Sequence, residues 1–242
     1  MLALLNAIGV ELLKMRKNKM LIISSLIVWL ITFFMFNTNN DLSLEDQQML
    51  LLAGGIATNM VFSIVSVFVV TVLVQREYQD HTIINLLTAP VMRRDFILSK
   101  AVAWFIWHVV TLIVKIVIVV LVIQLTYTEP LSSHVLAEMV GNMARLGLLS
   151  YVAFLPLLWI TIVQRRLFYP SLFIGIFLSI LQNSVGMPFD NMIPWTAITR
   201  VSLSESQAVI GTSGIIMGLI SIFATGIGGL IFACLSFAKQ DQ

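Results

Sequence analysis

The sequence predicts an all-α polytopic membrane protein, with six transmembrane helices and an N-terminal amphipathic helix at the membrane interface. Of its 242 residues, 59% are apolar and only 11% are charged, and the mean hydropathy is +0.98. A soluble domain usually carries about a quarter charged residues. Apolar stretches near the ~20 residues that a membrane-spanning helix needs recur along the whole chain. These observations exclude a soluble enzyme, a nucleic-acid-binding protein and a disordered chain.

Residues 1–19 predict a helix that lies along the membrane surface. Five apolar residues recur there at helical spacing: Leu4, Leu5, Ile8, Leu12 and Met15. This pattern gives one apolar face, which is typical of an interfacial helix. Basic residues follow the apolar part instead of preceding it, and no small-residue cleavage site is seen. We therefore do not expect a signal peptide.

Six apolar stretches predict the transmembrane helices: residues 20–36, 50–74, 101–125, 146–163, 172–185 and 209–237. We take residues 1–242 as one transmembrane permease domain built from them. The fourth stretch contains Pro156. The fifth is short and ends in polar residues, and Gly186, Pro188 and Pro194 follow it closely. That helix is therefore either complete or broken and re-entrant.

The basic residues predict the orientation. Eleven of the 14 Lys and Arg residues lie before the first stretch, between the second and third, between the fourth and fifth, or after the sixth. The opposite loops carry acidic residues, and Arg200 is their only clear basic residue. Because basic loops stay inside, we expect both termini in the cytoplasm. The outer loops are too short to be folded domains.

Catalytic chemistry is not expected in this chain. No glycine is followed by lysine, so the phosphate-binding loop Gly-x-x-x-x-Gly-Lys-[Ser/Thr] is missing. The three histidines are far apart, and the single Cys234 excludes an intrachain disulfide. We expect no catalytic residue, cofactor or metal here, and any ATP hydrolysis must come from another chain. No acid lies in a predicted span, which argues against ion-driven carriers and membrane proteases.

The segment 75–100, between the second and third spans, is the most structured cytoplasmic stretch. It carries a compact apolar patch at residues 83–87, and Pro90 then ends any helix. A short helix with such a patch suits docking into a groove of a partner protein. The alternative is a plain interfacial helix under the lipid headgroups.

Here the chain resembles the membrane subunit of type-2 ABC exporters. The resemblance rests on the residues Glu77, Thr82, Leu86, Leu87, Pro90, Arg94 and Lys100, on the N-terminal helix ending in Lys-x-Arg-Lys, and on Pro194-Trp195. His81 departs from the family pattern, which commonly has glycine there. The permeases of bacitracin, lantibiotic-immunity and peptide-toxin exporters are the most similar group in size and outer loops.

The resemblance implies partners and sites. It implies that an ABC ATPase subunit, which binds ATP and Mg, couples to this chain through Glu77, Thr82, Leu86, Leu87, Pro90 and Arg94. It also implies a second permease copy or a homologous permease. The expected function is export of an amphipathic peptide antibiotic or toxin by alternating access. The alternatives are a non-transporting membrane assembly or sensor protein that docks a partner, and a membrane-embedded enzyme.

Polar and small residues inside the spans are further candidates. Trp104, His108, Thr111 and Lys115 fall on one helical face of the third span. We expect Lys115, His108 and Thr111 on the translocation path, or else a lysine that backbone carbonyls satisfy or that snorkels to the interface.

The sixth span carries a row of small residues, and we interpret it as a helix-packing face within the subunit or between subunits. The row consists of Gly214, Gly218, Ser221, Thr225 and Gly229.

Overall fold

The computed structural model describes residues 2–37, 44–79, 93–126, 132–164, 167, 169–184, 191–203 and 212–239. Nearly all of these residues are helical, and no β-strand occurs within these ranges. The helices are α1 (Leu2–Lys17), α2 (Lys19–Phe36), α3 (Leu44–Gln79), α5 (Arg93–Thr126), α6 (Ser133–Phe154), α7 (Pro156–Gln164), α8 (Tyr169–Leu181), α9 (Pro194–Ser202) and α10 (Thr212–Ala238). The predicted all-α membrane fold is confirmed.

Helices long and apolar enough to cross a membrane account for five of the six predicted spans. They are Lys19–Phe36, Leu51–Gln79, Arg94–Thr126, Ser133–Gln164 and Thr212–Ala238. The predicted fifth span is different, because α8 has only 13 residues. At 1.5 Å per residue it is about 20 Å long, against a hydrocarbon core of ~30 Å. The structure therefore favours the broken form of this segment.

Protein contacts hold the end of α8 in place. The Ser63 hydroxyl of α3 donates to Oε1 of Gln182 at 3.0 Å, and the Thr199 hydroxyl of α9 donates to the Gln182 carbonyl at 2.7 Å. Irregular backbone at membrane depth is tolerated only where protein or water satisfies it. The bond from Thr199 satisfies the backbone carbonyl of Gln182 where the helix ends, and the bond from Ser63 holds its side chain.

The fourth span begins earlier than predicted and bends at its proline. α6 starts at Ser133 and not near residue 146, so much of the expected outer loop is helix. Pro156 has no N–H to donate to the Val152 carbonyl, and the chain makes a turn at Leu155. The Leu155 N–H donates to that carbonyl instead, at 3.2 Å.

Helix α10 packs against this bend through glycines. A Cβ atom at Gly226 would lie 2.4 Å from the Val152 carbonyl oxygen, and one at Gly229 would lie 2.5 Å from Cα of Pro156. Real Cβ atoms do not approach backbone so closely, so only glycine fits at either position. These contacts are within the chain.

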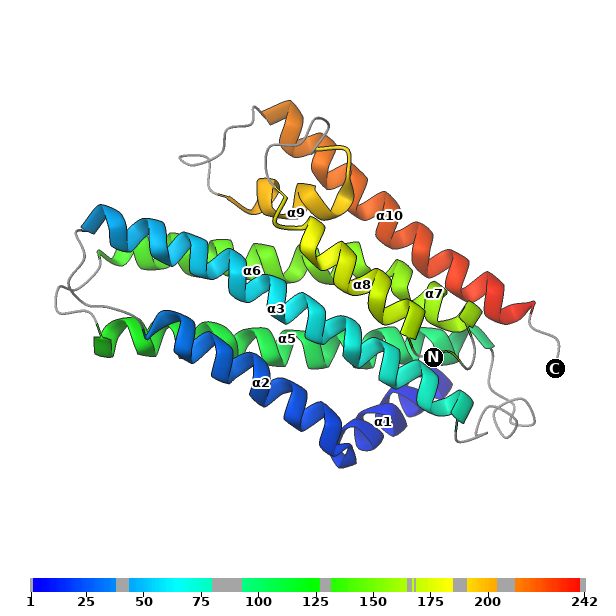
Figure 1. The fold of residues 1–242 in the computed structure, drawn as a ribbon. Coiled ribbons are helices and arrows are strands. Elements are labelled where there is room, and N and C mark those ends of the chain that lie inside the picture. The colour runs from blue at the N-terminus through cyan, green and yellow to red at the C-terminus, as the bar shows by residue number, and fades with distance from the viewer. Residues whose placement is uncertain are drawn as a thin grey trace.

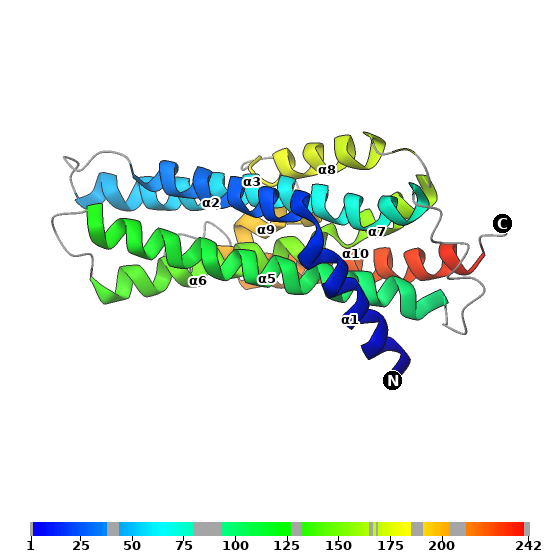
Figure 2. The same ribbon diagram turned by 90° about the horizontal axis from the view of Figure 1, so that it is seen from below.

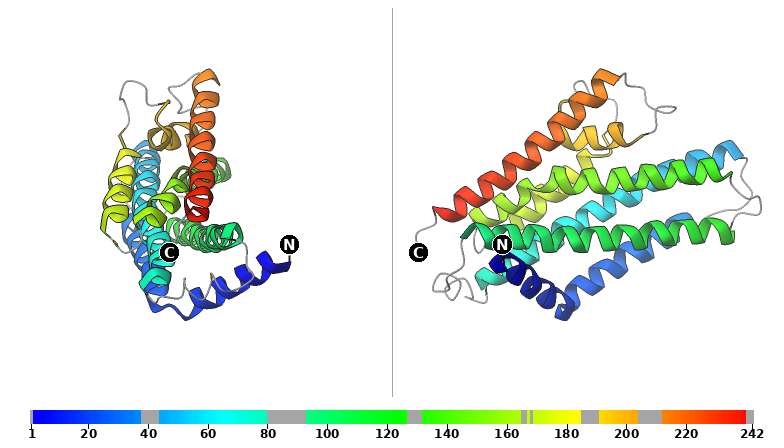
Figure 3. Two further views of the ribbon diagram at one scale, coloured as in Figure 1. Left: turned by 90° about the vertical axis from the view of Figure 1, so that its right-hand side faces the viewer. Right: turned by 180° about the vertical axis from the view of Figure 1, so that it is seen from behind.

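The helices form an elongated bundle with α1 set apart at one end. Figures 1 and 2 show α2, α3, α5 and α6 running along the bundle, while α1 diverges from it. In the left view of Figure 3, seen down the bundle, α1 runs along one side of it, at an angle to the long helices. This placement matches a helix lying along the membrane surface.

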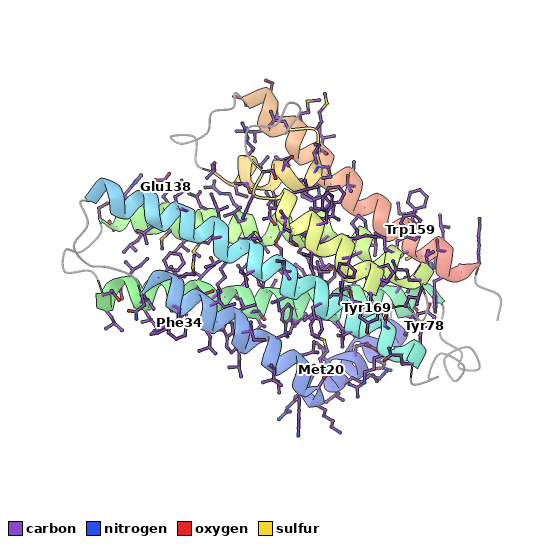
Figure 4. The ribbon with its side chains drawn as sticks, in the orientation of Figure 1. Met20, Phe34, Tyr78, Glu138, Trp159 and Tyr169 are labelled. Carbon is purple, nitrogen blue, oxygen red and sulfur yellow. The ribbon has the colours of Figure 1, made fainter. Side chains whose placement is uncertain are left out.

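Much of the remaining surface is apolar, as a lipid-facing surface requires. Met20 and Phe34 of α2 are 59% and 64% exposed and point away from the bundle in Figure 4. Phe173 of α8 and Ile220 of α10 are similarly exposed.

Candidate functional site

Of the predicted coupling residues, the structure describes Glu77 and Arg94. Glu77 is near the end of α3, and Arg94 is in the first turn of α5. Thr82, Leu86, Leu87 and Pro90 lie outside the described residues. The structure therefore gives the two ends of the predicted coupling segment and what holds them.

An ionic cluster of four residues joins these two ends to α1. Nζ of Lys100, in α5, lies 2.9 Å from Oε2 of Glu11 and 3.2 Å from Oε1 of Glu77. Nζ of Lys14 lies 2.8 Å from the same Glu77 oxygen and 3.3 Å from Oε1 of Glu11. Two cations and two carboxylates from α1, α3 and α5 thus form one group, which we call the ionic cluster.

The members of the ionic cluster differ sharply in burial. The side chains of Lys100, Glu11 and Glu77 are 1%, 6% and 7% exposed, whereas that of Lys14 is 47% exposed. Burial alone lowers the pKa of Lys14, but its hydrogen bond to Glu77 and the charges of Glu11 and Glu77 raise it, and the net shift is upward. Lys100 is therefore the structural centre of the cluster, and Lys14 is its solvent-facing member.

Apolar packing supports the same junction. Nζ of Lys100 lies 4.8 Å from the ring centroid of Phe96, and that ring stacks on Phe237 of α10 at 5.2 Å. Met15 of α1 is buried in the same core cluster. The start of α5 is therefore packed between α1 and the end of α10.

Glu11 is the member that the sequence analysis missed. It is the only acid of the amphipathic helix, and it lies three residues before Lys14. A single acid among the apolar residues of such a helix is the pattern that could have identified Glu11 as a candidate. Its main partner, Lys100, is 89 positions away along the chain.

A second group of polar side chains lies inside the membrane-spanning part. Trp104, His108, Thr111 and Lys115 are all buried, with at most 1% exposure. The predicted polar face of α5 thus points into the chain, towards α3 and α6, and not towards lipid.

His108 has a complete set of hydrogen bonds. The Gly147 carbonyl can only accept, so Nε2 of His108 carries a proton and donates to it at 2.9 Å. On the other side of the ring, Nδ1 and the Ser66 hydroxyl share a hydrogen bond of 2.9 Å. The Ser66 oxygen in turn accepts from Nε1 of Trp104 at 2.9 Å. This chain of bonds ties α5 to both α3 and α6.

Lys115 is in the opposite situation. Its side chain is fully buried, and in the part of the chain that the structure describes Nζ has no hydrogen-bond partner. It lies 5.5 Å from the ring centroid of Phe62. Among the described residues, Nζ therefore bonds to no backbone carbonyl, and it is buried and does not reach the interface.

Asn59 of α3, one turn from Phe62, is a further polar residue that the sequence analysis missed. It is fully buried, with 0% exposure. Among the described residues, neither its amide oxygen nor its amide nitrogen has a hydrogen-bond partner. Its helical spacing with Ser63 and Ser66 was the signal that could have found it.

Comparison with known proteins identifies the family of this chain. The model of a family described as ABC-2 family transporter protein matches residues 7–182. Over 170 residues the chain is 28% identical to the bacitracin transport permease protein BCRB of Bacillus licheniformis, covering 70% of this chain and 80% of that protein. The family match includes the ionic cluster and the polar face of α5. The chain belongs to the ABC-2 transporter family and is a multi-pass membrane permease subunit.

Proposed function

We propose that this permease is the membrane subunit of an ATP-driven exporter of an amphipathic peptide antibiotic or toxin. The family supports transport powered by a partner ATPase, and the relative named for bacitracin transport supports the substrate class. The observation that carries the proposal is the ionic cluster. It joins α1 to both ends of the segment on which an ATPase would act.

The ATPase docks on the segment 75–100, and the ionic cluster transmits its movement. Glu77 precedes the centre of this segment and Lys100 ends it, and both bind Glu11 of α1 directly or through a shared lysine. Breaking a buried ion pair costs about 3–5 kcal/mol. Because of that cost, α1 and the facing ends of α3 and α5 move as one unit when the ATPase closes.

The transport path opens where α3, α5 and α6 meet. Lys115 and Asn59 are buried without hydrogen-bond partners among the described residues. Contact with water or a substrate would therefore stabilise both side chains. The conformational transition of alternating access brings water or substrate to these side chains. Lys115, His108 and Thr111 lie on the resulting path. A second permease copy, identical or homologous, completes the transporter, and both termini lie in the cytoplasm.

Docking is tested with the double substitution Leu86→Asp, Leu87→Asp. This variant should insert into the membrane and fail to co-purify the ATPase, because two buried carboxylates would disrupt an apolar interface. Leu167→Asp is the control, since Leu167 is an exposed leucine in another predicted cytoplasmic loop, and it should retain the ATPase. The purified chain alone should hydrolyse no ATP. Full export by the double variant would contradict docking at this segment.

The path is tested with Lys115→Met, which keeps the volume of the side chain and removes its charge. Insertion should be unchanged or improved, because the cost of a charge at mid-membrane, ~2.5–3.5 kcal/mol, disappears. Export should fall, and replacement of His108 should show a weaker effect in the same direction. Val117→Met, on the exposed face of the same helix, should change neither. Normal export by Lys115→Met at normal expression would end the path assignment.

A further inference from the structure

A charged cavity of about 250 Å³ lies between the end of α1 and the end of α3. Lys14, Lys17 and Arg76 line it together with Glu11 and Glu77. Apolar side chains, including Met15, Val72 and Leu73, form another part of its wall. The cavity therefore combines a cationic and an apolar surface.

The charge that a ligand would meet in this cavity is positive. Glu11 and Glu77 are only 4% and 6% exposed, and the ionic cluster holds their carboxylates. Lys14, Lys17 and Arg76 are exposed. Among the described residues that line the cavity, three exposed cations thus accompany two carboxylates that are nearly buried.

The position of the cavity in the fold is that of the lipid headgroups. Helix α1 lies at an angle to the long helices (Figure 3), and it exposes apolar residues such as Leu13, at 60%. Helix α2 starts at Lys19, beside the cavity, and exposes Met20 to lipid at 59%. The boundary between water and hydrocarbon therefore runs through this junction.

We propose that this cavity binds the phosphate headgroup of an anionic phospholipid. Lys17 from α1 and Arg76 from α3 bind the phosphate, with Lys14 beside them, and the apolar wall packs against the start of an acyl chain. A phosphodiester joined to hydrocarbon matches both surfaces, whereas free phosphate matches only the cations. The bound lipid would bridge α1 and α3 beside the ionic cluster. This site does not depend on what the protein exports.

The test uses the purified chain in nanodiscs of phosphatidylcholine, with or without phosphatidylglycerol. We measure the melting temperature and, by native mass spectrometry, the phosphatidylglycerol that remains bound. The natural protein should retain the anionic lipid and melt at a higher temperature with it, because a ligand of the folded state stabilises that state. Lys17→Gln with Arg76→Gln should weaken this binding about thirty-fold, the equivalent of ~2 kcal/mol for two cations.

The matched control is Lys19→Gln with Lys239→Gln. It removes the same charge from the same side of the bundle, but neither residue lines the cavity. This control should bind the lipid within about threefold of the natural protein, because neither side chain is part of the cavity wall. All four substituted residues are exposed, so none of the variants should impair folding.

Three results would overturn the assignment. Equal loss of lipid in both double variants would show that general surface charge attracts it. Inorganic phosphate that raises the melting temperature in phosphatidylcholine alone, as much as the lipid does, would make free phosphate the ligand. Unchanged lipid retention by the cavity variant, together with loss of the ATPase from co-purification, would assign the surface to that partner. A failure of export in any variant bears on the proposed function and not on this site.

Discussion

Replacing Lys100 with methionine should destabilise the protein far more than the same replacement of Lys14. Both lysines bind Glu11 and Glu77, at 2.9 and 3.2 Å for Lys100 and at 3.3 and 2.8 Å for Lys14. They differ in burial, at 1% against 47% side-chain exposure. The comparison therefore isolates the effect of burial on one pair of carboxylates.

The expected magnitudes follow from that difference. Loss of Lys100 removes the buried cation from two carboxylates that are at most 7% exposed, and Lys14, the other cation of the ionic cluster, faces solvent. Removing one partner of a buried ion pair costs about 3–5 kcal/mol. Lys14 is screened by water, so its replacement should cost only about 0.2–1 kcal/mol. Glu11→Gln in the Lys100→Met background should recover part of the loss, because it removes one uncompensated charge.

The assay is reversible unfolding in mixed micelles, followed by tryptophan fluorescence as the share of denaturing detergent rises. The free energy of unfolding is compared among the natural protein, the two single variants and the double variant. Equal losses for Lys14→Met and Lys100→Met would refute the argument from burial. A loss below ~1 kcal/mol for Lys100→Met would refute it as well, since that is the range of exposed pairs.

Three further predictions concern packing, topology and pH. Gly229→Ala should destabilise the protein by about 1–3 kcal/mol, because its Cβ would lie 2.5 Å from the backbone of Pro156, whereas Gly228→Ala, with nothing within 4 Å, should not; unfolding in micelles compares them. Cysteine at Glu45 should react with impermeant thiol reagents on intact cells, and labelling of cysteine at Arg93 from outside would reverse the proposed orientation. The pKa of Lys14 is raised above 10.5, so its contribution to stability should be complete below pH 10.5 and lost as the pH rises through the folded-state value. Lys14→Met should therefore show a shallower loss of stability at high pH, and identical curves would contradict this.

The apolar spans could be predicted because the bilayer constrains them locally. A chain that crosses hydrocarbon must satisfy every backbone group within one helix, so length and hydropathy suffice to find it. The predicted span 20–36 nearly equals α2, and the predicted span 101–125 lies within the longer α5. The predicted fifth span ends in polar residues, and no local rule says which groups bond to them. In the structure, Ser63 and Thr199, from other helices, bond to Gln182 at that end.

The bend in the fourth span shows a partial success of sequence reasoning. The presence of Pro156 predicts a missing hydrogen bond in the helix. The sequence does not say which element packs there. That element is α10, since a Cβ at Gly226 or Gly229 would collide with the backbone at the bend.

The sequence by itself determined the class of this protein, its membrane-spanning helices, the absence of a phosphate-binding loop and the polar face of α5. Each of these depends on residue type and on spacing of at most a few turns. The tertiary structure decided which charges are neutralised and which are left alone. Glu11 meets Lys100 across 89 positions, and His108 meets Gly147 across 39, while Lys115 on the same helix meets no hydrogen-bond partner among the described residues. The free energy of a buried charge depends on the atoms within a few ångströms of it, and in this bundle those atoms come from helices far apart in the sequence.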